Sequence, residues 1–401
     1  MRLLFVTYRF PVYPGCASSN TVFNLLKYFS RSHEVFLAGL SRGPVSETQR
    51  ETLRPYCRRM EIVEWPNYRG AANAVRGLAS SEPLQMWYFR SASLAGRVKR
   101  IIDEEKIDLA YGYHLRSSQY LAAIDSIPSV VALQPAQILH FGRRCQLTRN
   151  PALRAVYSLE HRRLIGYEAE VAQKFDSCLL ISTKDRQAID PENRLRNVFL
   201  NPHGTDTGFF APPVRAVHDE NTVVFCGSMA MDTNVDAVLH FRRNILPLIW
   251  QQRPATRFVI VGRNPARQIL KLTDDPRIQV TGFVEDVRPY LWNASVGVDP
   301  IRMAAGMQNK VIEGLAAGLP MVISPEANEG IGAPEGSILI GRTTDEFAAH
   351  VVALLKDRSR AAALAKQGLA FVQKQWSWEH HFRRLETLFD ALVSQRACAT
   401  A

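Results

Sequence analysis

The sequence predicts an α/β fold made of two doubly wound, parallel-sheet domains. Short runs rich in β-branched and aromatic residues alternate with helical stretches through both halves of the chain, which indicates strand–helix–strand crossovers. Residues 201–221 interrupt this alternation, because they are rich in Pro, Gly and polar residues and have no hydrophobic period. The chain has 401 residues, 46% of them hydrophobic, and is therefore long enough for two cores.

In the first half, β-rich runs predict strands and amphipathic spacing predicts helices. The expected strands are residues 2–8, 33–40, 59–65, 107–113, 129–134 and 177–182. The helices include residues 18–31 and a long one at 151–174. A loop rich in small and polar residues, RFPVYPGCASSN, follows the first strand and holds Gly15.

The second half repeats the scheme after the linker. The expected strands are residues 222–228, 257–262, 278–284, 295–300, 320–324 and 337–341. A helix is expected at 234–250, and another ends at Gly318 with Pro320 just beyond it. Two such Rossmann-like halves would face a cleft between the carboxyl ends of their sheets, where open α/β folds bind ligands.

Composition narrows the class of function. The six cysteines form no C-x-x-C pair, which argues against a metal cage or a disulfide framework. The chain has neither G-x-G-x-x-G after its first strand nor a P-loop motif, so a dinucleotide or P-loop site is not supported. No apolar run reaches membrane-spanning length, and the N-terminal LLFV is too short for a signal peptide, so a cytoplasmic protein is expected.

The formal charge of +11 indicates an anionic partner. Part of the excess lies between Arg143 and Arg163, where arginines alternate with apolar residues. Such a segment can rest peripherally on an anionic membrane surface, and for this protein we expect the inner face of the cell membrane. The alternative is a solvated helix face that only aids solubility.

The helix before Gly318 has an unusual face. Lys310, Glu313, Gly314 and Ala317 lie together there, although glycine inside a helix costs about 1 kcal/mol relative to alanine. A cation, a carboxylate and bare backbone on one face indicate a ligand that approaches closely.

Several segments, taken in order, resemble one protein family. They are RLLFVTYRFPVYPG, NPHGTDTGFF, FCGSMAMDTNVDAVLHF, FVIVGRNP, GMQNKVIEGLAAGLPMV and WSWEHHFRRLETLF. Together they resemble the nucleotide-sugar glycosyltransferases of the GT-B fold, and more narrowly the retaining group 1 branch, including sugar transferases associated with exopolysaccharide gene clusters. The resemblance covers about residues 2–392.

The resemblance implies three parts. Residues 1–205 would be the acceptor-binding domain, residues 206–376 the donor-binding domain, and residues 377–401 a helix that packs back on the first domain. The partners implied are a nucleotide-sugar donor and a glycan, lipid-linked or small-molecule acceptor. No nucleic acid is expected.

The same resemblance assigns Glu313 to the donor ribose. The family's E-x7-E motif would place its first glutamate at position 305, where this chain has Ala305, so the sugar of the donor is left open. The loop after the first strand of the second half, MAMDTN, also lacks the Arg and Lys that many relatives direct at the diphosphate. Arg302 and Lys310, with Arg263 nearer the base or phosphates, are the expected substitutes.

The candidate residues then fall into three groups. The catalytic candidates are Arg302, Lys310 and His114. The donor-binding candidates are Gly227, Ser228, Arg263, Gly306, Met307, Gln308, Asn309 and Glu313. The acceptor-side candidates are Gly15 and Gln134.

Chemistry supports these roles without a metal. A helix N-terminus and cations can stabilise a leaving diphosphate, and the sequence contains no Asp-x-Asp for a metal bridge, so no cofactor and no metal are expected. No general base stands out, which suits retention, because the departing phosphate can take the acceptor proton. Gly306 and Gly314 would let the nucleotide approach the backbone.

Structural alternatives remain for the charged candidates. Lys310 and Glu313 could form a surface ion pair, Arg302 and Arg263 could be salt-bridged, and His114 could be a packing histidine. The expected function is transfer of a sugar from a nucleoside diphosphate to a hydroxyl in glycan, polysaccharide or glycosylated-metabolite synthesis. The alternatives are a nucleotide-sugar 2-epimerase of the same fold and a silent nucleotide-binding scaffold.

Overall fold

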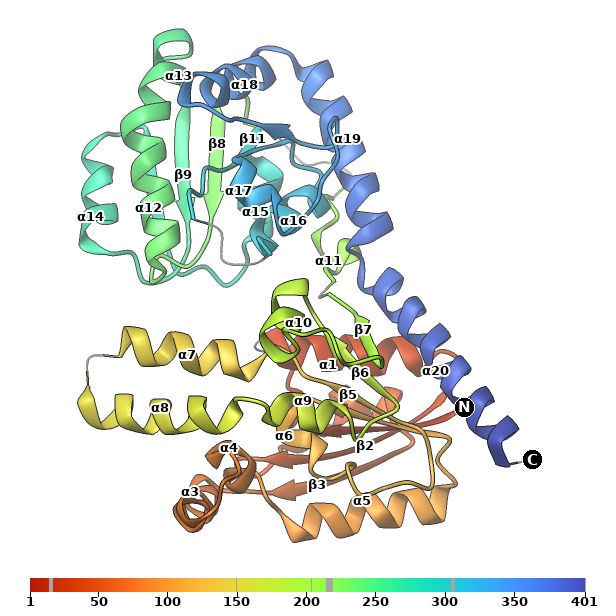
Figure 1. Ribbon diagram of the computed structural model, residues 1–401. Helices are drawn as coiled ribbons and strands as arrows, with labels where there is room; N and C mark the ends of the chain where they lie inside the picture. Colours follow the sequence, from red (N-terminus) through yellow and green to blue (C-terminus); the bar gives the residue numbers. More distant parts are fainter. Residues whose placement is uncertain (14–16, 149, 203, 214–218, 304–306, 401) are drawn as a thin grey trace. The chain divides into compact units, whose positions relative to one another are not determined.

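The computed structural model describes residues 1–13, 17–148, 150–202, 204–213, 219–303 and 307–400 (Figure 1). The chain divides into two compact units, which are described separately. Unit 1 comprises Met1–His203 together with His381–Ala401, and unit 2 comprises Gly204–His380.

Unit 1 is built on a seven-stranded sheet in the order β3-β2-β1-β4-β5-β6-β7, in which every neighbouring pair is parallel. Its strands are β1 (Arg2–Thr7), β2 (Glu34–Ser41), β3 (Arg59–Glu64), β4 (Leu109–Tyr113), β5 (Ser129–Ala132), β6 (Ser177–Leu180) and β7 (Val198–Leu200). The chain order reverses between β1 and β4, so the carboxyl ends of these two strands form the switch point where such sheets bind ligands.

Helices connect and cover these strands (Figure 1). They are α1 (Ala17–Phe29), α2 (Glu47–Leu53), α3 (Asn67–Arg76), α4 (Leu84–Tyr88), α5 (Ala92–Glu105), α6 (Leu115–Ser118), α7 (Gln137–Leu147), α8 (Pro151–Leu164), α9 (Tyr167–Ala172) and α10 (Thr183–Ile189), with short 3₁₀ turns at Arg54–Tyr56 and Gly77–Ala79. The predicted helix at 151–174 is wrong in one respect. It divides into α8 and α9 at Gly166, whose φ of 78° a right-handed helix does not allow.

Unit 2 has a six-stranded parallel sheet in the order β10-β9-β8-β11-β12-β13. Its strands are β8 (Thr222–Cys226), β9 (Arg257–Val261), β10 (Ile278–Gly282), β11 (Val296–Asp299), β12 (Met321–Ile323) and β13 (Leu339–Ile340). The switch point lies between β8 and β11. The prediction of two Rossmann-like parallel-sheet domains is therefore confirmed.

The helices of unit 2 cover both faces of this sheet (Figure 1). They are α11 (Thr207–Phe210), α12 (Asp232–His240), α13 (Leu246–Gln252), α14 (Arg267–Leu270), α15 (Arg288–Asn293), α16 (Asn309–Ala316), α17 (Pro325–Asn328), α18 (Thr344–Lys356) and α19 (Arg358–Gln375), with a 3₁₀ turn at Lys271–Asp274. The predicted helix at 234–250 contains a π-helical turn at Phe241–Ile245. Pro247 follows this turn and has no N–H to continue the α-helical bonds.

The last helix, α20 (Trp378–Thr400), begins in unit 2, and its residues from His381 belong to unit 1. There the ring of Phe389 stacks on Phe29 at 5.2 Å. Tyr28 Oη donates a hydrogen bond to Glu386 at 2.9 Å, and the His33 ring lies 2.7 Å from the same carboxylate. Apolar stacking and a shared carboxylate thus attach α20 to α1.

Candidate donor site and a cluster in unit 1

The loop after β8 is held by close backbone contacts. Gly227 N–H donates to Val261 O at 2.9 Å, and a Cβ added at Gly262 would lie 1.8 Å from the carbonyl oxygen of Gly227. A Cβ at Gly227 would lie 2.8 Å from Nδ2 of Asn234, which itself donates to Ser228 O at 3.0 Å. Side chains are excluded at Gly227 and Gly262, and Asn234 fixes Ser228 at the carboxyl end of β8.

Lys310 lies in the first turn of α16, and its ammonium reaches the same asparagine. Its Nζ donates to Asn234 Oδ1 at 2.8 Å, lies 3.0 Å from Asp299 Oδ1 and packs 4.6 Å from the centroid of the Phe225 ring. The Lys310 side chain is 11% exposed and Asp299 is fully buried. Burial raises the pKa of Asp299 to about 6, while the Lys310 ammonium works in the opposite direction.

Lys310 is therefore ion-paired with Asp299, so the alternative of a surface pair with Glu313 is wrong. The network runs from β11 through Lys310 to α12 and, by way of Asn234, to the loop after β8. Through these contacts Lys310 holds the backbone of the loop after β8 in position.

Glu313 lies one turn deeper in α16. No residue of the described ranges forms a hydrogen bond with its carboxylate, and burial raises its pKa to about 7. A carboxyl group in this state is an unused hydrogen-bond acceptor. The adjacent Gly314 has a structural reason instead, because a Cβ there would lie 2.8 Å from Met321 Sδ. Gly314 allows α16 to pack on β12, and its expected role in nucleotide approach stays a prediction.

The two arginine candidates differ in their partners. The Arg302 guanidinium forms a two-point ion pair with Asp236, with Nε at 3.0 Å from Oδ2, which is the predicted structural alternative. Arg263 is exposed and its carbonyl accepts from Met229 N–H at 3.0 Å. Within the part of the chain that the structure describes, no carboxylate pairs with the Arg263 side chain.

The start of α16 follows these residues. Met307 and Gln308 precede the helix, Asn309 is its first residue, and the Gln308 side chain makes no cap hydrogen bond. The first backbone N–H groups of a helix have no partner inside it and carry a partial positive charge. Ala305 and Gly306 lie outside the described residues.

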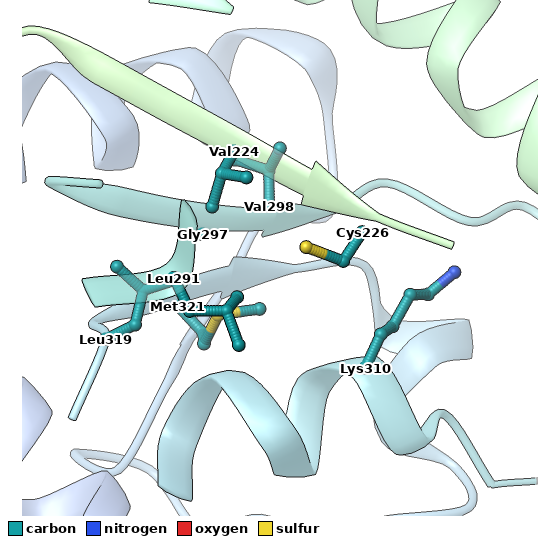
Figure 2. Close-up of a pocket in the computed structure, with 8 residues that line it drawn as sticks. All are labelled: Val224, Cys226, Leu291, Gly297, Val298, Lys310, Leu319 and Met321. Atoms are coloured by element: carbon teal, nitrogen blue, oxygen red, sulfur yellow. The ribbon is translucent and has the colours of Figure 1, made fainter. Parts of the chain in front are cut away.

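A small cavity lies under α16 (Figure 2). Its lining is mostly apolar and consists of Val224, Cys226, Leu291, Gly297, Val298, Lys310, Leu319 and Met321. Figure 2 shows Lys310 extending from α16 toward the end of β8, with its ammonium beyond Cys226. With a volume of about 10 Å³ this cavity is a packing space with room for at most one water, not a nucleotide pocket.

In unit 1, His114 follows β4 at the switch point. Its ring packs 4.6 Å from the Tyr8 ring, and its Nδ1 accepts from Arg116 N–H at 3.3 Å. Burial, and then the charges of Arg116, His140 and Arg9, lower the pKa of His114 well below its usual value. The imidazole is therefore neutral at physiological pH.

Of the two acceptor-side candidates, the structure describes only Gln134. Gln134 is buried, and none of the described groups hydrogen-bonds to its Oε1. Gly15 lies outside the described residues. The catalytic or acceptor roles of His114 and Gln134 stay predictions.

Sequence reasoning missed Asp299, Asn234 and Asp236 in unit 2 and Arg116 in unit 1. A signal existed for Asp299, because SVGVDP ends a strand with a carboxylate at the ligand-binding edge. Nothing in the sequence connects Asn234 with Lys310, since they are distant in the chain and meet only through the fold.

Neither a metal site nor a membrane-spanning helix is found in the described ranges. No group of three His, Cys, Asp or Glu side chains there is arranged to hold a metal ion. None of the helices in those ranges has the length and apolar character that a membrane crossing requires.

Two Rossmann-like units in one chain are typical of the GT-B fold, and the similarity to solved structures supports this assignment. The chain is similar to HepE from Anabaena, solved in complex with UDP, at 13% identity with 98% of this chain and 100% of that chain covered and a TM-score of 0.59. It is also similar to sucrose-phosphate synthase from Thermosynechococcus elongatus, at 15% identity, 98% and 99% coverage and a TM-score of 0.63. At these identities the likeness concerns the fold.

Residues 220–357 match the family model of the group 1 glycosyl transferases. A curated relative, the GDP-mannose-dependent alpha-(1-6)-phosphatidylinositol monomannoside mannosyltransferase of Mycobacterium tuberculosis (strain H37Rv), is 30% identical over 207 residues, which are 44% of this chain. The chain spans about half the length of this relative, 52%. The prediction of the GT-B fold is confirmed by these structures, and the match to the group 1 glycosyl transferases lies within residues 220–357.

Proposed function

We propose that the protein transfers a sugar from a nucleoside diphosphate to an acceptor hydroxyl, with retention and without a metal. The observation that carries the proposal is Glu313, a half-buried carboxylate without a described partner, which lies in the matched range 220–357 and which the resemblance assigns to the donor ribose. Two ribose hydroxyls would supply the hydrogen bonds that the carboxylate lacks.

The diphosphate of the donor would meet the start of α16. The first turn of α16 carries the partial positive charge of a helix N-terminus, which attracts phosphate, and Arg263 adds a cation without a described carboxylate partner. Negative charge grows on this group as the glycosidic bond breaks, so fixed donors there lower the barrier. Arg302 would join them by exchanging Asp236 for phosphate.

Lys310 contributes differently in this scheme. Its charge is balanced by Asp299, so its main effect is to hold Asn234 and thereby the loop at Ser228. A rigid loop keeps its backbone in place while the leaving group departs, without reorganisation.

The donor and acceptor are named only by class. The names of the related proteins mention GDP-mannose and UDP, so both purine and pyrimidine nucleotides are candidates. The acceptor would be a glycan, a lipid-linked sugar or a small molecule in polysaccharide or related synthesis, and the enzyme would act in the cytoplasm.

A donor panel tests the proposal. The protein is incubated with radiolabelled UDP-, GDP- and dTDP-sugars, with and without EDTA, and free sugar, transferred sugar and epimer are separated by chromatography. Slow hydrolysis or transfer from one donor, insensitive to EDTA, is expected. Epimer as the product would favour the 2-epimerase, and the absence of both binding and turnover would refute the proposal.

We also propose that the hairpin formed by α7 and α8 rests on an anionic membrane. The two helices lie side by side (Figure 1). They carry exposed apolar residues among exposed arginines. The apolar residues are Leu139, Leu153 and Val156, and the exposed arginines are Arg143, Arg144, Arg154 and Arg162. Such a surface combines insertion with attraction to anionic headgroups.

Two of the predicted basic residues do not enter this argument. Arg163 donates to the carbonyls of Gly77, Leu78 and Glu82 and so anchors α8 to its own unit, and it is therefore left out of the proposed surface. Arg149 lies outside the described residues.

Vesicle flotation tests the membrane proposal. The wild type should float with phosphatidylcholine vesicles that contain phosphatidylglycerol, and salt should weaken the binding. A double variant R143Q/R144Q should bind less, and Arg100→Gln, an exposed position on α5, serves as the charge-matched control. Equal flotation of the double variant and the control would assign the arginines to solubility.

A further inference from the structure

Arg116 is clamped between aromatic rings in unit 1. It belongs to α6, directly after β4 and the switch point. Its guanidinium carbon lies 4.9 Å from the centroid of the Tyr8 ring and 4.9 Å from that of Phe89, and these two rings meet edge to face. Rings that contact the guanidinium fix its plane, so its terminal nitrogens present donors in a preset direction.

The hydrogen bonds of Arg116 are incomplete. Its Nε donates to Gln85 Oε1 at 3.0 Å, and within the described ranges neither terminal nitrogen has a hydrogen-bond acceptor and no carboxylate lies at ion-pair distance. The acid that influences it, Glu160, accepts instead from the backbone N–H groups of Leu84 at 2.5 Å and Gln85 at 3.1 Å. The side chain is only partly buried, so a ligand can reach it.

The surroundings of Arg116 add positive charge. Burial, and then the charges of Arg9 and Arg42, lower the pKa of Arg116, while Tyr8 and Glu160 oppose them. Arg9 lies 5.7 Å from the Tyr8 ring on which Arg116 also packs. A partly desolvated cation with other cations nearby is unfavourable without an anion, and a residue with such a perturbed pKa is a candidate for a ligand site.

We propose that Arg116 binds a phosphate group of the sugar acceptor, through its two terminal nitrogens. This inference rests on the proposed function, in which the groups assigned to the donor lie in unit 2, and it specifies the acceptor as a phosphorylated molecule. A guanidinium fork matches two phosphate oxygens, and Tyr8 and Phe89 keep it oriented before binding. The phosphate could belong to a soluble sugar phosphate or to a phospholipid headgroup, since the contact is the same.

The test is a binding titration of the full chain with inorganic phosphate and with glucose 6-phosphate, at constant ionic strength, by calorimetry. The wild type should bind both, with millimolar affinity for phosphate. Arg116→Gln should weaken binding by about ten-fold or more, because it removes a charge-assisted pair of bonds. Arg116→Lys, which keeps the charge but loses the fork, should fall between the two. Arg100→Gln should bind like the wild type.

Further measurements distinguish a lipid phosphate from a soluble sugar phosphate and show which results would overturn the inference. If Arg116→Gln also loses retention on vesicles containing phosphatidylglycerol, the phosphate is that of a lipid; if only sugar phosphate binding falls, it is a soluble acceptor. Unchanged phosphate affinity in Arg116→Gln, or no phosphate binding by the wild type, would overturn the inference. An equal loss of UDP and GDP affinity would overturn it too, by assigning Arg116 to the donor diphosphate.

The titration does not depend on turnover, so it can fail while the donor panel succeeds, or the reverse. A variant that fails to fold is recognised by its melting curve, and Arg116→Lys then carries the comparison. Its affinity equal to that of the wild type would show that the fork is not used.

Discussion

Replacing Glu313 with glutamine should stabilise the free protein and weaken its binding of donor. Burial raises the pKa of this carboxyl from 4.5 to about 7, so its ionised form is unfavourable in the folded chain. At roughly 1.4 kcal/mol for each tenfold change in proton affinity, this shift corresponds to about 3 kcal/mol. Glutamine keeps the shape and removes the charge.

The sign of the pH dependence follows from this shift. Below pH 4.5 the carboxyl is protonated in both the folded and the unfolded chain, so its burial costs little. As pH rises from 4.5 to about 7 the unfolded chain ionises first, and wild-type stability falls. The advantage of Glu313→Gln should therefore grow through this window and level off above it.

Donor binding should change in the opposite direction. Hydrogen bonds from hydroxyls to a charged acceptor contribute about 1.5 to 3 kcal/mol, so affinity for nucleoside and nucleotide sugar alike should fall about 10- to 150-fold. Urea melts at about pH 4 and pH 8 give the stability, and calorimetry gives the affinity. Glu329→Gln, an exposed position of the same unit, is the control. A Glu313→Gln variant that is less stable at pH 8 and binds donor normally would refute the reasoning.

The remaining predictions concern the two cations near the donor site. Lys310→Ala leaves Asp299 buried without its ion pair and should lose about 3 to 5 kcal/mol of stability above pH 7. The loss should be smaller near pH 5, where Asp299 can take up a proton. Urea melts that show a loss below about 1 kcal/mol at both pH values, equal to that of the exposed Lys271→Ala, would contradict this prediction. Arg302→Gln breaks a solvent-exposed pair and should change stability by less than about 1 kcal/mol while sugar transfer slows about ten-fold; wild-type turnover would leave Arg302 a structural partner of Asp236.

The fold could be predicted because its signals are local. Each strand of the two sheets is a short apolar run between turn residues, and right-handed crossovers leave few ways to arrange such runs. The sequence does not predict helix α7, and the reason is physical. Its first N–H groups, at Gln137 and Ile138, are capped at 2.8 Å each by the Glu168 carboxylate, which arrives from α9. A cap from a distant element leaves no mark in the local sequence.

The candidate site could be predicted in its positions and less well in its partners. The periodicity around Lys310 and Glu313 indicated that both lie on one helix face, as they do on α16. Their different environments come from other elements. Asp299 at the end of β11 takes the ammonium, and Glu313 is left with burial alone. Which charges pair across a sheet edge depends on the positions of other elements, and the spacing of residues within one helix does not predict those positions.

A crystal structure with bound UDP or GDP would test the central claim most directly. The account predicts the two ribose hydroxyls within hydrogen-bond distance of the Glu313 carboxylate and the phosphates at the first N–H groups of α16. A nucleotide bound elsewhere in the chain, with Glu313 untouched, would contradict it.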